Sequence, residues 1–531
     1  MEHSEQAHLI QALQDPSLYP HSITKFQVIE THISWVLLTG PFAYKIKKSV
    51  DFGFVNFTTL DKRKFFCEEE MRLNKRLAPQ LYNKVLPIFG SSLNPTFESQ
   101  GLPIEYAVQM QQFTQEKRLD ELLTKGGVQE RHILQFAEDL ASFHSDSEVA
   151  GHETLYGTPE VLRNPVQECL DDVARIFPQS IDQTILTHLG QWMQTEWVAR
   201  RSTFIHRKQD GFIRECHGDL HLANVILWKD YVMAFDCLEF NPTLRWIDVL
   251  SEVAFFVMDL EVAHHPDLAS PFLNRYLEKT GDYAGLTVVR FYKVYRALVR
   301  AKVAALSCQA THEKEAGQAS FERECVRYLR VATQLTHPPK PFLCIMHGLS
   351  GSGKSTVSDF LLKKIDVIRV RSDVERKRLL GFHSEAKTPM EQSSSVYSSA
   401  MTDRTYEKLK ELTKDLLKSG YSVVVDATFL RYKDRQAFSQ LATGCQVPMV
   451  LLDIQAPPDE LRRRIGQRLQ KPVSVSEASL KVLEEQLVMA EALRPEERAH
   501  TIEVDSMEED YAEKVVSRIG KEAYVRNKGD G

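Results

Sequence analysis

Long apolar segments are missing from this sequence. None of its 531 residues belongs to an apolar run near the roughly 20 residues that cross a membrane. The first residues, 1–6, are acidic and polar, and they lack the basic and apolar regions of a signal peptide. These absences predict a cytoplasmic protein that contacts no membrane.

Cysteine pairs that bind metals or build disulfide frameworks are missing as well. The eight cysteines include no CxxC pair and have no metal-ligand spacing: Cys67, Cys169, Cys216, Cys237, Cys308, Cys325, Cys344 and Cys445. We interpret them as reduced, mostly buried thiols of a cytosolic protein.

An excess of positive charge is the third absence. Up to Lys340 the chain has 36 basic and 43 acidic residues, and after it 30 and 29, for a net charge of −6. Broad, non-specific binding of nucleic acid requires a strongly basic surface. Neither half therefore favours that function, although a local basic groove stays open.

The length predicts about two to four domains, and a proline-rich segment indicates where they divide. Residues 336–341 contain three prolines, which cannot continue a helix and favour an extended connector. Before this segment the first 110 residues favour strands, and residues 119–335 are largely helical apart from about 216–236. After it, apolar runs near 342–346, 367–370, 422–426 and 449–453 alternate with helical segments, which predicts a parallel sheet.

Residues 217–224 form the first motif, with the sequence HGDLHLAN. Asp219 and Asn224 have the spacing of the protein-kinase catalytic loop, in which the Asp accepts the proton of the attacking hydroxyl and the Asn binds magnesium. Asp236 follows an apolar strand and can supply the second metal-binding carboxylate. The set predicts phosphoryl transfer from ATP or another NTP with Mg²⁺.

This motif resembles the aminoglycoside phosphotransferase and choline kinase branch of the kinase-like superfamily. Residues from about 25 to 330 are similar to an uncharacterised bacterial group of aminoglycoside phosphotransferase-like proteins. The resemblance implies a small β-lobe before a helical lobe, with Asp219 as the catalytic base and Asn224 and Asp236 as metal ligands. His217 would brace the loop, and Asp248 would buttress it from the next helix. A catalytically inactive domain of this kind is the alternative.

The β-lobe of such a fold should supply a lysine for the nucleotide phosphates and a glutamate that pairs with it. Lys45 is the candidate, but Lys47 lies on the same face of its strand and is a rival. Glu70 is the favoured glutamate, and Met110 is the expected nucleotide contact from the strand 106–110. The family's glycine-rich loop is absent, and residues 31–34 offer hydroxyls and backbone amides in its place.

The second motif is a P-loop, GxxxxGKS, that follows an apolar strand and opens a helix. Lys354 is expected to reach the β- and γ-phosphates and Ser355 to bind Mg²⁺, while backbone amides surround the phosphates. The expected nucleotide-binding residues are Gly348, Ser350, Gly351, Ser352, Gly353, Lys354, Ser355 and Thr356.

Residues around this P-loop narrow its class. Asp373-x-x-Arg376 resembles polynucleotide kinases and zeta-toxin-like small-molecule kinases, in which the Asp activates the acceptor hydroxyl and the Arg contacts the acceptor phosphate or the transferred group. Asp426 ends a buried strand as a Walker-B-like metal ligand. Arg464 and Arg468 share a helix face and resemble lid arginines. A solvated basic helix is the alternative for those two.

Together these features predict a two-domain chain. Residues 1–335 form an α+β protein-kinase-like bilobal fold (β-lobe about 25–115, helical lobe about 116–335), 336–341 are the linker, and 342–531 form an α/β P-loop NTPase with a parallel sheet. The expected function is a bifunctional ATP-dependent phosphotransferase acting on a small molecule or on a nucleotide or oligonucleotide end. The alternatives are a C-terminal 5′-hydroxyl polynucleotide kinase and an N-terminal domain that only binds nucleotide and regulates. The acceptors and the oligomeric state stay open.

Overall fold

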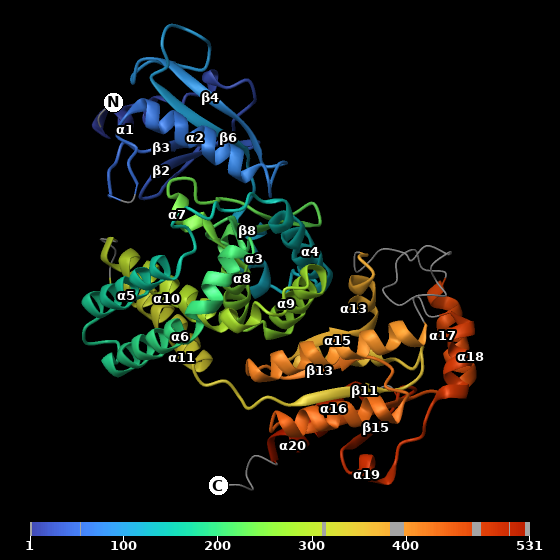
Figure 1. The fold of residues 1–531 in the computed structure, drawn as a ribbon. Coiled ribbons are helices and arrows are strands. Elements are labelled where there is room, and N and C mark those ends of the chain that lie inside the picture. Colours follow the sequence, from blue (N-terminus) through green and yellow to red (C-terminus); the bar gives the residue numbers. More distant parts are fainter. Residues whose placement is uncertain are drawn as a thin grey trace. The chain divides into compact units, whose positions relative to one another are not determined.

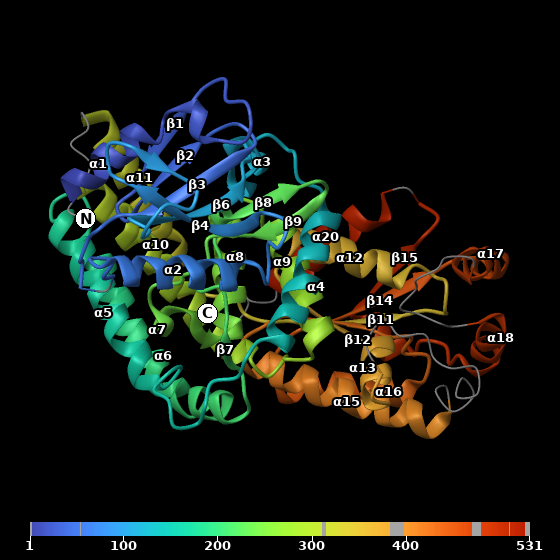
Figure 2. The same ribbon diagram turned by 90° about the horizontal axis from the view of Figure 1, so that it is seen from above.

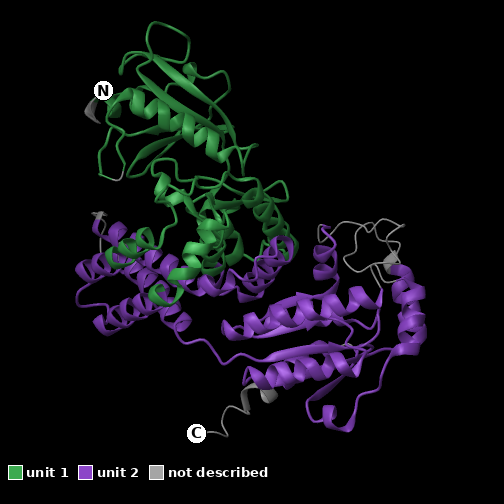
Figure 3. Ribbon diagram, viewed as in Figure 1, with its two compact units in different colours: residues 1–168, 197–259 green, residues 169–196, 260–531 purple. Residues whose placement is uncertain are grey.

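The computed structural model describes residues 3–53, 55–310, 315–382, 398–469, 479–508 and 510–525. The chain divides into two compact units. Unit 1 comprises residues 1–168 and 197–259, and unit 2 comprises residues 169–196 and 260–531 (Figure 3). Among the described residues, no helix combines the length and the apolarity needed to cross a bilayer.

Unit 1 begins with a six-stranded antiparallel sheet of order β1-β2-β3-β6-β4-β5 (Figure 1). Alternate residues of β2 and β3 face opposite sides, so that α1 covers one face and α2 the other. The helix α1 was not expected from the sequence, and it places residues before position 25 in the β-lobe. The elements are α1 (His3–Ala12), η1 (Pro16–Leu18), β1 (Gln27–Glu30), β2 (Ser34–Leu38), β3 (Phe42–Lys47), α2 (Leu60–Asn74), β4 (Tyr82–Gly90), β5 (Pro95–Thr96) and β6 (Glu105–Gln111).

Helices and two short antiparallel pairs, β10-β7 and β8-β9, complete unit 1. The HGDLHLAN segment connects β7 to β8, and Asp236 follows β9, so the short strands bring the motif residues together. The elements are η2 (Gln115–Lys117), α3 (Leu119–Thr124), α4 (Glu130–Asp146), β7 (Ile213–Glu215), η3 (Leu222–Asn224), β8 (Val225–Trp228), β9 (Tyr231–Ala234), α7 (Pro242–Arg245) and β10 (Trp246–Asp248). Three helices are divided between the units: α5 (Pro159–Ile176), α6 (Gln183–Gln209) and α8 (Val249–Val262), of which α8 lies mostly in unit 1.

Unit 2 contains a five-stranded parallel sheet of order β12-β13-β11-β14-β15, seen from above in Figure 2. The P-loop lies between β11, a central strand, and α12. Its elements are α9 (Pro266–Thr280), α10 (Leu286–Ala310), α11 (Glu315–Leu335), β11 (Leu343–His347), α12 (Lys354–Lys364), β12 (Ile368–Arg371), α13 (Ser372–Leu379), α15 (Ser399–Lys418), β13 (Val423–Asp426), α16 (Tyr432–Gly444), β14 (Met449–Gln455), α17 (Pro458–Leu469), α18 (Leu480–Met489), α19 (Pro495–Arg498), β15 (Thr501–Asp505) and α20 (Tyr511–Val525).

The two predicted fold classes are confirmed: a β-lobe followed by a helical lobe, and a parallel α/β P-loop domain. The compact units, however, do not divide at residues 336–341. Because α9 packs against α12 and β12, the last helices before the proline-rich segment belong to the same unit as the P-loop sheet.

Candidate active sites

The catalytic-loop motif of unit 1 is held by its own side chains. Gly218 has φ 92°, and a Cβ there would lie 2.9 Å from the carbonyl oxygen of Leu244, so this position requires glycine. The Asn224 amide donates to the carboxylate of Asp219 at 3.1 Å. That bond orients the proposed base and leaves the amide oxygen of Asn224 as a ligand for a cation.

His217 is fully buried and braces this loop. Its Nε2 lies 2.8 Å from the carbonyl oxygen of Phe235, while the Asp219 amide donates to its Nδ1 at 3.3 Å. A carbonyl can only accept, so Nε2 carries the proton and Nδ1 does not. Burial lowers the pKa of His217, which agrees with a neutral ring.

Two carboxylates of α8 accept hydrogen bonds from the backbone of the HGDLHLAN loop. Glu252 accepts from the amide of Gly218 at 2.7 Å, and Asp259 accepts from the amide of Leu222 at 2.8 Å. Asp248, the residue expected in this role, forms an ion pair with Arg207 at 2.6 Å and caps the amide of Leu250. Residues on the following turns of the helix thus contact the loop backbone directly.

Glu252 makes the stability of unit 1 dependent on pH. Burial favours its neutral form, but bonds from His144 and Gly218 outweigh burial and lower its pKa to about 2. A depressed pKa contributes stability above the unfolded value near 4.5, and that contribution is lost as pH falls toward 2. We expect Glu252→Gln to lower the denaturant midpoint at neutral pH, and the difference from wild type to shrink as pH approaches about 3.5. A difference that stays constant with pH would contradict this assignment.

The β-lobe directs one lysine toward the loop. Lys45 lies 2.8 Å from Glu70 and 2.6 Å from Asp236, whose backbone takes a left-handed φ of 62°. Although burial opposes its charge, Asp236 and Glu70 raise the pKa of Lys45 well above its ordinary value. Lys47 is 1% exposed and forms ion pairs with Glu70 and Glu239. Lys45 is thus the lysine that contacts Asp236, the proposed metal ligand. Lys47 pairs with the second carboxylate oxygen of Glu70 and helps to fix its position.

Two further expected contacts of the nucleotide lie near this group. Met110 pairs with Ala43 across the sheet and belongs to an apolar cluster that also contains Ile226 and Met233. The β1–β2 turn forms at residues 31–34, as expected. The amides of Ile33 and Ser34 donate to Thr31 Oγ1 within the turn, at 3.3 and 2.9 Å. Phosphate binding by those amides would require the turn to open.

In unit 2 the P-loop backbone depends on glycine. Gly348 has φ 147°, and a Cβ there would collide with the carbonyl oxygen of Ile454. Lys354 Nζ donates to the carbonyl oxygens of Gly348 and Leu349 at 2.9 and 2.7 Å, so it folds back over the loop. Ser355 donates to the carboxylate of Asp426 at 3.0 Å. A hydroxyl and a carboxylate in contact are hard oxygen donors of the type that Mg²⁺ prefers.

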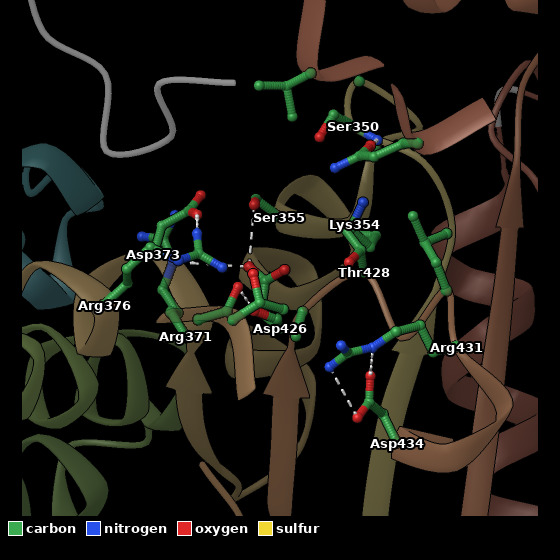
Figure 4. Close-up of a pocket in the computed structure, with 18 of the residues that line it drawn as sticks. Ser350, Lys354, Ser355, Arg371, Asp373, Arg376, Asp426, Thr428, Arg431 and Asp434 are labelled. Carbon is green, nitrogen blue, oxygen red and sulfur yellow. Dashed lines mark hydrogen bonds and ion pairs between the residues drawn. The ribbon is translucent and has the colours of Figure 1, made fainter. Parts of the chain in front are cut away.

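A cavity of about 890 Å³ opens beside this P-loop (Figure 4). Asp373 and Arg376 line it and lie 3.1 Å apart, one helical turn from each other on α13. Residues that sequence reasoning did not single out also line it, namely Arg371, Tyr406, Arg431, Asp434 and Gln486. Arg371 ends β12, and Arg431 follows the end of β13 by five residues. Position near the carboxyl end of a predicted parallel strand is the sequence signal that could have identified both arginines.

The arginines of α17 divide into two groups. Arg464 lines the cavity and donates to the P-loop carbonyl oxygens of Gly351 and Ser352 at 3.3 Å. Arg462 and Arg463 form exposed ion pairs with neighbouring acidic residues, as a solvated helix face does. The side chain of Arg468 lies outside the described part of the chain.

The chain is similar in part to several known proteins. Residues 343–493 match the AAA_33 family model, an AAA domain. An uncharacterized protein of Mycobacterium tuberculosis (strain H37Rv) is 29% identical over 442 residues, which cover 83% of this chain and 86% of the relative. Among solved structures, a sugar kinase of Janibacter sp. HTCC2649 is 19% identical and covers 35% of this chain and 94% of its own, with a TM-score of 0.26. A choline kinase of Cryptosporidium parvum is 11% identical and covers 61% and 95%, with a TM-score of 0.40.

The described residues thus carry a kinase-like catalytic-loop motif in unit 1 and a P-loop in unit 2, and both motifs position nucleotide phosphates in the proteins that use them. The C-terminal part of the chain carries a P-loop domain of the AAA_33 type.

Proposed function

We propose that the chain is a bifunctional ATP-dependent kinase, in which each site transfers the γ-phosphoryl group to a hydroxyl. One observation supports the proposal: each unit brings together a lysine, carboxylates and further oxygen donors of the kinds that such a site needs. The sets are Lys45, Asp219, Asn224 and Asp236 in unit 1, and Lys354, Asp373, Ser355 and Asp426 in unit 2.

In the kinase-like site, Asp219 accepts the proton of the acceptor hydroxyl as the new P–O bond forms. Asn224 holds its carboxylate in place, and Glu70 positions Lys45 for the nucleotide phosphates. Asn224 and Asp236 would bind Mg²⁺, which when bound neutralises phosphate charge. In the absence of nucleotide, Lys45 bonds to Asp236, and this bond must loosen for the lysine to reach a phosphate.

In the P-loop site, Asp373 serves as the base for the second acceptor. Lys354 leaves its loop carbonyls to contact the β- and γ-phosphates, while Arg376 and Arg464 stabilise the charge that spreads over the transferred group. Ser355 and Asp426 would hold Mg²⁺. A ring of arginines lines the cavity, and its positive charge favours an acceptor with an anionic group. Its members among the described residues are Arg371, Arg376, Arg431 and Arg464.

That ring also supports the second candidate, a 5′-hydroxyl kinase for nucleotides or oligonucleotide ends, with a kinase-like unit that regulates. The observation in its favour is the Asp373–Arg376 pair beside a cavity of about 890 Å³, which accommodates a nucleotide-sized acceptor. A cytoplasmic location is part of the proposal, and its support is that all eight cysteines are free thiols.

The test is transfer from γ-labelled ATP, and from other labelled NTPs, to a panel of sugars, nucleosides, aminoglycosides and 5′-hydroxyl oligonucleotides. We expect two acceptor classes, one lost with a change at Asp219 and the other with a change at Lys354. Labelling of oligonucleotide ends alone, unaffected by Asp219, would select the second candidate. If no acceptor on a broad panel is labelled and neither change alters nucleotide hydrolysis, the proposal fails.

A further inference from the structure

The edge strand β12 of the P-loop sheet is covered by α9, a helix that precedes the proline-rich segment. The side-chain amide of Asn274 donates to the carbonyl oxygen of Val367 at 3.0 Å and accepts from the amide of Arg369 at 2.7 Å. The hydroxyl of Tyr283 donates to the carbonyl oxygen of Arg369 at 3.3 Å. Asn274 is fully buried and replaces a neighbouring strand, so α9 is a built-in part of this sheet.

One turn further along α9, Glu278 meets the side chains that leave β12. It is 1% exposed, and its carboxylate lies 2.8 Å from the guanidinium of Arg369 and 3.6 Å from that of Arg371. Burial works against its charge, but Arg369 and Arg371 outweigh burial and lower its pKa. Glu278 is therefore a buried anion that pairs with two arginines of β12 and, at 3.8 Å, with Arg275 of its own helix.

Glu278 also holds the far end of α13, the helix that carries Asp373 and Arg376. Its carbonyl oxygen accepts from the guanidinium of Arg378 at 2.7 Å. Arg371 stands immediately before α13 and Arg378 lies in its last turn. A single residue of α9 thus contacts an arginine at each end of the helix that presents the proposed acceptor-side residues.

Arg371 connects this contact to the proposed metal site. Its Nε lies 3.6 Å from Asp426 Oδ2, the atom that accepts from the hydroxyl of Ser355, and Figure 4 shows the two side chains next to each other. Arg371 lies between two carboxylates, Glu278 on the α9 side and Asp426 on the cavity side. We propose that Glu278 is a positioning residue for the P-loop site. Its carboxylate balances part of the positive charge of Arg371, and Asp426 therefore stays available to bind Mg²⁺.

This inference rests on the proposed function of the P-loop site and specifies its consequence. Without the carboxylate of Glu278, the charge of Arg371 is balanced by Asp426, and the arginine competes with Mg²⁺ for that carboxylate. We expect Glu278→Gln to raise the Mg²⁺ concentration for half-maximal binding of a non-hydrolysable ATP analogue by about tenfold, within the range of coupling between neighbouring charged groups. Glu278→Gln with Arg371→Gln should bring that concentration down to the value of Arg371→Gln alone, at or below wild type.

The measurement uses the full chain and reads only the part of analogue binding that Lys354→Ala removes, so that any binding at the kinase-like site is subtracted. Glu261→Gln is the matched control, because Glu261 is a carboxylate of the same unit that pairs with Lys293 at 2.6 Å instead of with Arg371. It should leave the Mg²⁺ requirement unchanged. Thermal unfolding of each variant identifies losses that come from misfolding.

Arg371→Gln alone tests the same idea if Glu278→Gln does not fold, since removing the competitor should lower the Mg²⁺ requirement below wild type. The positioning role would be overturned if folded Glu278→Gln has the Mg²⁺ requirement of wild type, or if the double variant is as impaired as Glu278→Gln. Either result would leave the proposed P-loop kinase intact. Binding that Lys354→Ala does not reduce in any background would remove the proposed function together with this inference.

Discussion

Replacing Lys354 with alanine is expected to lower phosphoryl transfer by the P-loop site about 10²–10³-fold, the cost of removing one preorganised donor to a developing negative charge. Lys354 is 9% exposed and its ammonium group rests on the carbonyl oxygens of Gly348 and Leu349, at the mouth of the loop whose amides would surround the phosphates. Alanine removes the only charge that this loop itself supplies. The measurement is initial rate against the acceptor that the panel identifies.

Lys364→Ala is the matched control for this variant. Lys364 ends the same helix, is exposed, and packs its ammonium group over the ring of Phe360. Its loss tests for a general effect of removing a lysine from α12, and we expect transfer within about twofold of wild type, as for most surface substitutions. Equal losses in both variants would show that Lys354 contributes through helix stability, and retained transfer in Lys354→Ala would show that the P-loop is not the site of reaction.

The P-loop could be placed from the sequence because its chemistry is local. Glycines, Lys354 and Ser355 are consecutive, and the turn they form needs few contacts from elsewhere beyond the strand and the helix on either side. The cavity around it could not be derived in the same way. Arg431, Tyr406 and Gln486 reach it from three separate helices or loops, and only the parallel order of the sheet brings those segments to one edge.

The kinase-like site shows a similar division. The spacing of Asp219 and Asn224 sufficed for the loop, but the choice between Lys45 and Lys47 could not be made, because both side chains leave the same face of β3. Burial separates them: Lys47 is enclosed by Glu70 and Glu239, whereas Lys45 reaches Asp236. Glu239 lies 192 residues from Lys47 along the chain, and no local pattern links the two.

Some elements of the fold were not expected either. The edge strand β15 lies outside the four apolar runs that predicted the sheet, and its five residues alternate between buried and more exposed positions, which is a weak signal over so short a run. It pairs with β14 in parallel, so hydrogen bonds to the neighbouring buried strand determine most of its extended conformation. Tertiary pairing, more than propensity, decides such a strand.

Replacing Asp219 with asparagine is expected to reduce transfer at the kinase-like site about 10²–10⁴-fold, the usual contribution of a positioned general base. The change keeps the size of the side chain and an oxygen that can accept from Asn224, so the loop should retain its shape. What it removes is the capacity to take a proton from the acceptor hydroxyl. Rates should fall without a matching change in nucleotide affinity, and separate measurement of kcat and of nucleotide KM checks this.

Asp230→Asn supplies the comparison for this site. Asp230 lies at the exposed β8–β9 turn with φ 72°, a left-handed conformation that asparagine adopts readily, and it pairs with Arg131 at 2.6 Å. An equal chemical change at this position should leave the rate near wild type, because exposed ion pairs contribute little. If Asp219→Asn is as active as Asp230→Asn, and changes at Lys45 alter turnover by the P-loop site, unit 1 binds nucleotide and regulates. Only one of the two sites then transfers phosphate.

The opposite outcome identifies two independent kinases on this chain. In that case Asp219→Asn alone abolishes labelling of one acceptor class, and Lys354→Ala alone abolishes labelling of the other.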